Sequence, residues 1–423
     1  MSEARFTARY TIETAFGLEE TAASMAGEQS TGTFLKLSSD DDPRVQRQAA
    51  SVVRVVHTGD ASAPSLPGAA VPKGATSVWR RGEVVLSWPL DTIGASLPNL
   101  LATVAGNLFE LQQLSAIRLR ELSLPRAFLD RYPGPAFGVE GTRRLAGVQR
   151  VPLLGTIIKP SVGLDAEQTA EIVAQLVDGG IDFIKDDELQ SDGAFCPFEK
   201  RVAAVMRVVN DRAQRNGRKA MVAFNVTGEI DEMQRRHDIV ARHDGTCVMA
   251  SLNSVGLSGF TALRRISSLP IHAHRNGWGL FYRSPHIGID YRAWSTLWRI
   301  AGADHMHVNG LRNKFSETDE SSIDSARSLL EPMFPDRAAT AMPVFSSGQW
   351  AGQAGETFAR LGSADLIYAC GGGIAGHPDG IAAGVESVRA AWEAAIEGEP
   401  VTQRAERTPA LATALSFFGG LRS

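Results

Sequence analysis

The chain has 423 residues, of which 43% are hydrophobic, and its 43 basic and 47 acidic side chains leave a formal net charge of −4. This is ample material for a large core, and the near balance of charge argues against a nucleic-acid or membrane partner bound by bulk electrostatics. The three cysteines (Cys196, Cys247 and Cys370) lie far apart, and no stretch approaches the ~18 apolar residues of a membrane span or signal-peptide type, so we expect a disulfide-free cytoplasmic protein.

The segment up to about residue 140 is predicted to form a mixed α+β domain. Residues 5–13 alternate between apolar and polar side chains, which is typical of a strand, and residues 46–57 and 84–90 are expected to be further strands. Residues 97–124 contain the apolar spacing of a helix. Proline and glycine accumulate over residues 131–147, which indicates a domain boundary there.

After Val151 the pattern changes to short β-branched runs that alternate with longer amphipathic stretches. Eight strand–helix pairs in about 250 residues predict a closed (β/α)₈ barrel. A doubly wound open sheet is the alternative, but it needs a switch in strand order that eight even repeats do not indicate. The predicted domains are therefore residues 1–140 and 141–423. The predicted barrel strands are 153–158, 181–185, 220–226, 246–250, 269–274, 304–308, 342–346 and 365–370.

The second barrel strand ends in Lys185-Asp186-Asp187-Glu188, and active sites of such barrels form at the carboxyl ends of strands. Strand alternation puts Lys185 and Asp187 on one face and Asp186 on the other. Two carboxylates suit Mg²⁺, and a neutral lysine can take up CO₂ as a carbamate, which adds an oxygen ligand and needs a depressed pKa. A charged strand end with internal salt bridges is the alternative interpretation.

Lys159 ends the first barrel strand and is predicted to stabilise an enolate or to move a proton, unless it is an ordinary surface lysine. The fifth and sixth strands each carry two histidines. We expect His274 and His307 to face the barrel interior, as acid, base or phosphate donor, and His272 and His305 to be structural. A zinc site on these imidazoles is the less favoured alternative beside the lysine and carboxylates.

Glycines close the last two strands, at Gly348 and at Gly371, Gly372 and Gly373. Loops in these positions of a barrel often bind phosphate through backbone N–H groups, and glycine lets the backbone approach the anion closely. We therefore expect a phosphorylated small-molecule substrate.

These motifs, in this order, resemble the RuBisCO superfamily over nearly the whole chain. The resemblance implies an N-terminal α+β domain of ferredoxin-like type before the barrel. It also implies a homodimer or higher homo-oligomer, without a small subunit, whose sites lie at the subunit interface. The matching stretches are STGTF (30–34), GNLFEL (106–111), GTIIKPSVGL (155–164), GGIDFIKDDE (179–188), HAHR (272–275), GADHMHVNG (302–310), VFSSGQ (344–349) and GGGIAGHPDG (371–380).

The same resemblance implies a role for each matching residue. Lys185 corresponds to a carbamylated ligand that binds Mg²⁺ together with Asp187 and Glu188, and Lys159 to the lysine that handles the enolisation proton. His274 corresponds to an inward active-site histidine. The remaining matches are Arg275 and His307 at a distal phosphate, Lys314 on a mobile loop, Ser346, Gly348 and Gly371 to Gly373 at a substrate hydroxyl and the other phosphate, and Glu28, Thr33 and Asn107 contributed by the partner subunit.

Four departures distinguish the chain from the carbon-fixing members of the superfamily. Ser161 stands where those carboxylases have a second lysine, Phe34 stands in place of a tryptophan, and Trp278 stands in place of a histidine. The loop around Lys314 reads VNGLRNKFSE rather than the glycine-rich sequence that closes over CO₂. The chain therefore resembles a RuBisCO-like protein rather than a carboxylase.

RuBisCO-like proteins catalyse several reactions, of which we favour decarboxylation or transcarboxylation with hydrolysis of 3-oxo-isoapionate 4-phosphate. That branched β-keto acid would lose CO₂ to leave an enediolate. The methionine-salvage reactions are the alternative: isomerisation of 5-methylthioribulose 1-phosphate, or enolisation of a 2,3-diketo-5-methylthiopentyl 1-phosphate. The salvage enolase takes its base from a lysine where this chain has Asn107. A non-catalytic ligand-binding relic of the fold is a further alternative.

Overall fold

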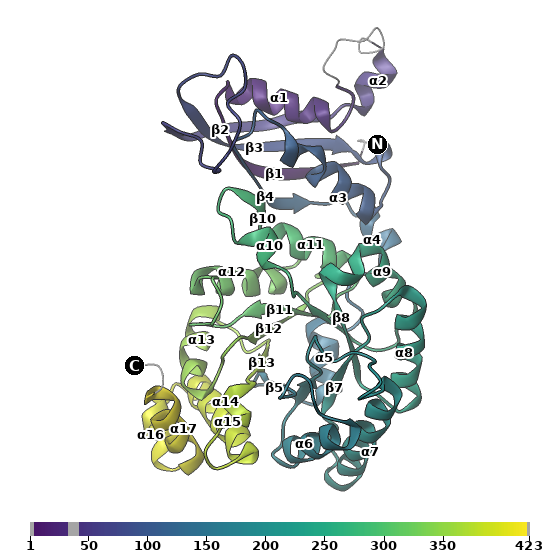
Figure 1. Cartoon of the computed structure of the whole chain (residues 1–423), viewed down its shortest axis with the longest axis vertical. Helices are drawn as coiled ribbons and strands as arrows, with labels where there is room; N and C mark the ends of the chain where they lie inside the picture. Colours follow the sequence, from purple (N-terminus) through teal and green to yellow (C-terminus); the bar gives the residue numbers. More distant parts are fainter. Residues whose placement is uncertain (1–3, 33–41, 421–423) are drawn as a thin grey trace. The chain divides into compact units, whose positions relative to one another are not determined.

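Two separate sheets contain the strands of the chain, and the structure, a computed structural model, describes residues 4–32 and 42–420. A five-stranded sheet belongs to a unit made of Met1–Pro133 and Gly277–Ile300, and a closed barrel belongs to a unit made of Gly134–Asn276 and Ala301–Ser423 (Figure 1). The predicted α/β class, a (β/α)₈ barrel after an N-terminal α+β domain, is confirmed.

The sheet of the first unit has the strand order β10-β4-β1-β3-β2, and only the β10–β4 pair is parallel. Alternate residues of its central strand, from Phe6 to Ile12, are fully buried, as the sequence pattern predicts. The Tyr10 hydroxyl donates to the Val104 carbonyl at 2.7 Å, which joins this face to a helix. The strands are β1 (Arg5–Thr14), β2 (Ser51–Ala61), β3 (Trp79–Pro89), β4 (Ala116–Ser123) and β10 (Ile287–Ile289).

Two predictions for this unit are wrong in part. The strand expected over residues 46–57 begins only at Ser51, because Pro43–Gln48 forms helix α2, whose N-cap Asp42 accepts from the backbone N–H of Arg44 at 2.8 Å. The apolar run of 97–124 is α-helical only over α3 (Leu97–Ala105); a short 3₁₀ turn follows at Asn107–Glu110, and the end of the run becomes strand β4. Pairing with β1 overrides the local helical spacing there.

The barrel strands run parallel in the order β11-β12-β13-β5-β6-β7-β8-β9, and β9 pairs with β11 to close the ring. All eight predicted barrel strands are confirmed, with ends shifted by no more than a few residues. They are β5 (Leu153–Ile157), β6 (Phe183–Lys185), β7 (Met221–Asn225), β8 (Cys247–Ser251), β9 (Ile271–His274), β11 (His305–Asn309), β12 (Met342–Ser346) and β13 (Ile367–Ala369).

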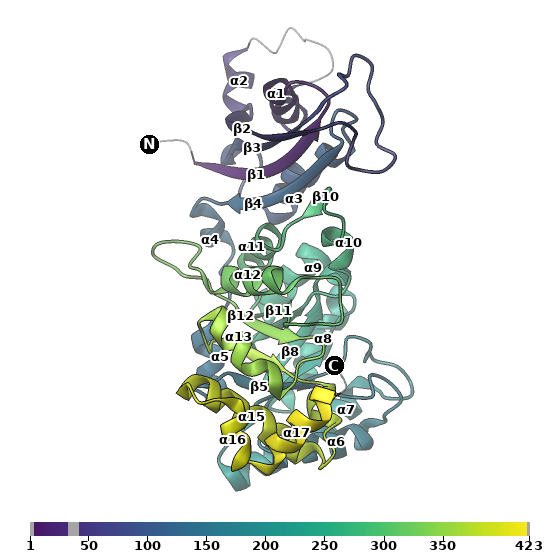
Figure 2. The same cartoon turned by 90° about the vertical axis from the view of Figure 1, so that its left-hand side faces the viewer.

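Helices surround the barrel, and Figure 2 shows the last three of them side by side at the end of the chain. None of the described helices is long and apolar enough to cross a membrane. The helices of this unit are α5 (Gly138–Ala146), α6 (Ala166–Asp178), α7 (Phe198–Asn216), α8 (Ile230–Arg242), α9 (Leu252–Ile266), α12 (Asp319–Leu330), α13 (Ala354–Leu361), α14 (Gly372–Ala375), α15 (Ile381–Glu397), α16 (Val401–Glu406) and α17 (Pro409–Gly420). The first unit also contains α1 (Leu18–Glu28), α4 (Ala127–Arg131) and α10 (Gly279–Tyr282), and α11 spans Tyr291–Ala301.

An apolar core fills the amino-terminal half of the barrel. Phe183, Met221 and Met249 are buried in one cluster with side chains of the other strands, and Val139 and Ala146 of α5 belong to the same cluster. Helix α5 therefore closes the amino-terminal end, and the polar residues on the inward face lie toward the carboxyl ends of the strands.

Asp304 holds this closing helix to the barrel. Its buried carboxylate accepts from the backbone N–H groups of Phe137 at 2.6 Å and Ile271 at 2.8 Å, and from the Arg264 guanidinium at 2.9 Å. Asp304 is absent from the predicted residues, since nothing in its neighbours along the chain indicates that distant segments supply its partners.

Replacing Asp304 by alanine should lower the free energy of unfolding by about 3–5 kcal/mol, because it leaves the buried Arg264 guanidinium without its counterion. Urea unfolding followed by circular dichroism measures the loss. Asp324→Ala is the matched control, since that carboxylate is 74% exposed, and its unfolding curve should overlay that of the parent protein. Equal stability of the two variants would contradict the role given to Asp304.

Candidate active site

Polar side chains occupy the carboxyl ends of the barrel strands, above the apolar core. Lys185 is the last residue of β6, after the buried apolar residues Phe183 and Ile184, and its charged side chain is itself only 1% exposed. Its Nζ donates to the Asp186 carbonyl at 2.7 Å and lies 3.6 Å from Oε2 of Glu188. Burial lowers the pKa of Lys185, and the neighbouring carboxylates oppose that shift only in part.

Asp187 is tied to the end of the first barrel strand. Its Oδ2 accepts from Lys159 Nζ at 2.7 Å and from the Ser161 hydroxyl at 2.9 Å, and Lys159 Nζ also donates to the Ser161 hydroxyl at 2.7 Å. Burial alone would raise the pKa of Asp187, but these hydrogen bonds and one from the backbone N–H of Leu189 outweigh it and hold the pKa below its usual value. Asp187 is therefore a carboxylate, and Ser161 helps to orient it.

Glu188 faces a neutral histidine. Its Oε2 lies 3.4 Å from Nε2 of His274, whose Nδ1 accepts from the backbone N–H of Asn276 at 3.3 Å. Burial, with the nearby charge of Lys185, lowers the pKa of His274 to about 4. Because Nδ1 is an acceptor, the single proton of the neutral ring is assigned to Nε2, where it points at the Glu188 carboxylate.

Two buried residues that the sequence analysis missed hold this cluster in place. Asn225, at the end of β7, donates to the backbone carbonyls of Glu188 at 3.2 Å and Gln190 at 3.0 Å. On the other face of β6, Asp186 meets the buried Arg201 guanidinium at 3.3 Å, so its carboxylate points away from Lys185 as strand alternation predicts. A polar residue at the end of the third barrel strand was the available signal for Asn225.

The residues described by the structure include no group of three or more His, Cys, Asp or Glu side chains that could hold a metal ion. Asp187 and Glu188 supply two carboxylates, and a hard divalent cation requires more oxygen ligands than these. The amine of Lys185 is buried beside them and has a lowered pKa, which favours the neutral form that reacts with CO₂. The donor set therefore fits Mg²⁺ only if Lys185 is carbamylated.

The prediction that only one histidine of each pair faces inward is wrong. Residues two apart on a strand share a face, so all four rings gather in one cluster of edge contacts. Nε2 of His272 lies 2.8 Å from Nε2 of His307, and the rings of His272 and His305 are in edge contact. Nδ1 of His307 lies 3.2 Å from the hydroxyl of Ser346. His272 and His305 therefore also face the barrel interior, where they pack against other side chains in a structural role.

The glycines expected at the phosphate site occupy tight turns after β12 and β13. Gly348 follows Ser347 with both residues at positive φ, and Gly371 precedes the short helix α14. A Cβ on Gly373 would lie 2.3 Å from the Gln349 carbonyl oxygen, so this position cannot accept a side chain without rearrangement. The turns thus bring two backbone segments together at one side of the barrel mouth.

The other predicted site residues are distributed as follows. Arg275 pairs with a buried carboxylate, Glu317, at 2.5 Å, and Lys314 is exposed on the loop after β11 with its ammonium over the Phe315 ring. Asn107 donates to the Glu28 carboxylate at 3.1 Å within the first unit. Thr33 and Phe34 lie outside the described residues.

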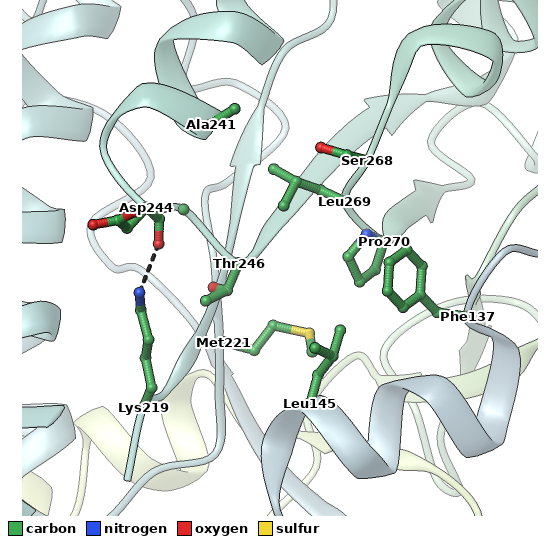
Figure 3. Close-up of a pocket in the computed structure, with 11 residues that line it drawn as sticks. Phe137, Leu145, Lys219, Met221, Ala241, Asp244, Thr246, Ser268, Leu269 and Pro270 are labelled. Atoms are coloured by element: carbon green, nitrogen blue, oxygen red, sulfur yellow. Dashed lines mark hydrogen bonds between the residues drawn. The ribbon is translucent and has the colours of Figure 1, made fainter. Parts of the chain in front are cut away.

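A pocket of about 410 Å³ opens at the opposite end of the barrel (Figure 3). Its walls include Met221, Leu269 and Pro270, at the start of β7 and β9, and Lys219 donates to the Asp244 carbonyl at 2.7 Å on one side. The pocket is largely apolar and lies at the amino-terminal ends of strands whose carboxyl ends carry the polar cluster. It is therefore separate from the candidate active site.

A closed barrel with a buried lysine, two following carboxylates and a neutral histidine at the carboxyl ends of its strands has the general arrangement of a (β/α)₈-barrel enzyme. Comparison with known families identifies the class more closely. The model described as ribulose bisphosphate carboxylase large chain, catalytic domain, matches residues 138–418, and that of the N-terminal domain matches residues 2–128. The chain belongs to the RuBisCO large-chain family.

Among the proteins that this chain resembles are two named for 3-oxo-isoapionate 4-phosphate and a rubisco-like protein of known structure. The chain is 55% identical over 418 residues to a 3-oxo-isoapionate-4-phosphate transcarboxylase/hydrolase of Xanthobacter autotrophicus, covering 99% of this chain and 100% of that protein. It is 42% identical to a 3-oxo-isoapionate-4-phosphate decarboxylase of Rhizobium rhizogenes, with 97% and 98% covered. The crystal structure of a rubisco-like protein from Burkholderia fungorum superposes with a TM-score of 0.92 at 45% identity, covering 98% and 100% of the two chains.

The buried histidines predict that acid destabilises the fold. Burial lowers the pKa of His305 to about 3 and lowers those of His272 and His307 well below their ordinary value. Below about pH 6.5 the unfolded chain binds protons that the folded chain does not, so stability falls by up to about 1.4 kcal/mol per pH unit for each histidine. This stability is present above about pH 6.5 and is lost as the pH falls toward the folded pKa values.

Urea unfolding between about pH 7 and pH 5 measures the slope, which His305→Gln should make shallower. His57→Gln is the control, since the His57 side chain is 53% exposed, and it should keep the parent slope. An unchanged slope in His305→Gln would contradict a neutral, buried ring.

Proposed function

We propose that the barrel mouth binds Mg²⁺ through Asp187, Glu188 and a carbamate on Lys185, and that it acts on a phosphorylated keto-sugar acid. The observation that carries this proposal is the burial of the Lys185 amine beside two carboxylates. Burial lowers the pKa of the amine and so favours its neutral form, which is the form that reacts with CO₂. A bound divalent ion would polarise a substrate ketone and stabilise the negative charge that develops on its oxygen.

The substrate that we propose is 3-oxo-isoapionate 4-phosphate, on the support of relatives at 55% and 42% identity that cover nearly the whole chain. This substrate is a β-keto acid, so the bond between its carboxylate and the adjacent carbon can break to give CO₂ and an enediolate. We infer transcarboxylation followed by hydrolysis: the CO₂ that is lost would add to the other carbon of the enediolate, and water would then cleave a carbon–carbon bond of the new β-keto acid to give two organic acids. Simple decarboxylation, the activity in the name of the 42% relative, is the second candidate.

The residues of this chain would divide the remaining work. The Lys159 side chain is 43% exposed and its amine is held by Asp187, so it can donate a proton or a hydrogen bond to the enediolate. The neutral His274 keeps Glu188 oriented through its Nε2–H. The Ser346 hydroxyl and the glycine turns after β12 and β13 would receive a substrate hydroxyl and the phosphate.

Assembly and location are part of the same proposal. We propose a homodimer or larger homo-oligomer in which Glu28, Thr33 and Asn107 of one subunit complete the site of its partner. Structural neighbours described as octameric and dimeric Rubisco, at 31% and 27% identity, support this assembly. We keep the expectation of a cytoplasmic protein without a small subunit.

The reaction type can be tested with substrate that carries ¹³C in its carboxylate, incubated with Mg²⁺ and bicarbonate in H₂¹⁸O. Transcarboxylation with hydrolysis should keep the ¹³C in an organic acid and add ¹⁸O to a product, as mass spectrometry would show. Release of the label as ¹³CO₂, with no ¹⁸O added to a product by cleavage, would show that the reaction is simple decarboxylation instead. Absence of turnover by folded protein would refute both and favour a non-catalytic relic.

The carbamate can be tested by substitution of Lys185. Lys185→Ala should lower kcat/KM by at least about a thousandfold, because it removes metal stabilisation of the transition state worth several kcal/mol. With ¹³C-bicarbonate and Mg²⁺, the parent protein should give a carbamate ¹³C signal that is missing in Lys185→Ala. The exposed Lys200 provides the control, and Lys200→Ala should keep both signal and activity. A carbamate signal that survives in Lys185→Ala would place the modification elsewhere.

A further inference from the structure

A buried ion pair lies beside the candidate active site, and it involves Arg275, which the sequence predicts at a distal phosphate. The Arg275 guanidinium, in the residue after His274, contacts Oε2 of Glu317 at 2.5 Å, and the two side chains are only 8% and 3% exposed. Glu317 lies in the loop between β11 and α12, 42 residues further along the chain.

Glu317 is held by two further hydrogen bonds. Asn309, the last residue of β11, donates to its Oε2 at 2.7 Å, and the Ser321 hydroxyl donates to its Oε1 at 2.9 Å. Asn309 in turn accepts from the Ser347 hydroxyl at 2.9 Å, in the turn after β12. The carboxylate is therefore held from the ends of β9 and β11 and from the first turn of α12, and it cannot turn away without breaking several hydrogen bonds.

This arrangement decides what Arg275 can bind. A buried guanidinium that already meets a carboxylate with charge-assisted hydrogen bonds offers little net positive charge to a second anion. A phosphate at this place would bring its negative charge against Glu317, or would displace it and leave a carboxylate buried without its counterion. Either outcome disfavours a phosphate here strongly.

We propose that Glu317 is a specificity-determining residue that closes the Arg275 side of the mouth to phosphate and restricts the site to substrates with one phosphate. The inference rests on the proposed function, because it assumes that the mouth accepts a sugar phosphate. The single phosphate is then bound on the side of the glycine turns after β12 and β13. Glu317 acts through Arg275 and is not itself a catalytic residue.

Binding of ribulose 5-phosphate and ribulose 1,5-bisphosphate tests the proposal, since the two ligands share a carbon chain and differ by one phosphate. Isothermal titration calorimetry with Mg²⁺ and bicarbonate present measures both Kd values without turnover. The parent protein should bind the monophosphate at least as tightly as the bisphosphate. Glu317→Gln should tighten bisphosphate binding by about tenfold or more and change monophosphate binding by less than about threefold, since it removes one buried negative charge.

Two further variants separate charge from structure. Glu317→Asp keeps the charge and should keep the selectivity of the parent protein. Glu320→Gln makes the same chemical change one turn away, at a carboxylate that is 75% exposed, and should alter neither affinity. A selectivity ratio that shifts equally in Glu317→Gln and Glu317→Asp would show a merely structural role and overturn the proposal.

The parent protein alone also decides the question if Glu317→Gln fails to fold. Tighter binding of the bisphosphate than of the monophosphate by the parent would overturn the inference. Loss of the proposed function is a separate result: a protein that does not turn over 3-oxo-isoapionate 4-phosphate can still show the selectivity switch. Conversely, turnover with no effect of Glu317→Gln on the selectivity ratio would refute only the role of Glu317.

Discussion

The burial of one amine is the constraint on which the barrel mouth depends. Lys185 ends a strand whose other side chains are apolar, so its Nζ is withdrawn from water while Glu188 and Asp187 stand close by. Desolvation destabilises the charged form of Lys185, whereas the neighbouring carboxylates stabilise it. Desolvation is the larger effect, so the pKa of Lys185 lies below its ordinary value. An amine in that state is reactive toward CO₂, and the product would add negatively charged oxygen beside the carboxylates of Asp187 and Glu188.

Neighbouring residues hold each acidic group of the barrel mouth in a fixed position. Lys159 and Ser161 hold Asp187, Asn225 holds the backbone of Glu188, and Arg201 takes Asp186 away on the other face of the strand. Each contact uses a charged or hydrogen-bonding group that would otherwise be costly to bury. The same principle accounts for the pair of Arg275 and Glu317, in which a cation near the site is neutralised by a carboxylate of the protein itself.

Much of the fold follows from local pattern. Eight β-branched runs with helical stretches between them predict the barrel, because each strand buries both faces and each helix covers one. The errors are instructive: β4 was expected to be helical, because its apolar spacing is ambiguous until β1 supplies a pairing partner. The predicted strand over 46–57 includes the last three residues of helix α2, although Asp42 and Pro43 are recognisable start signals for a helix.

For the site, the sequence by itself determined which polar residues stand at strand ends. It therefore predicted that five of them would lie together: Lys159, Lys185, Asp187, Glu188 and His274. Only the tertiary structure decided which partner each of them meets. The contact of His272 with His307, the support of Glu188 by Asn225 and the Glu317 carboxylate against Arg275 join residues 35 to 42 positions apart. Such pairings depend on the register of neighbouring parallel strands and on loop paths between them, and neither is encoded in the spacing of residues along one strand.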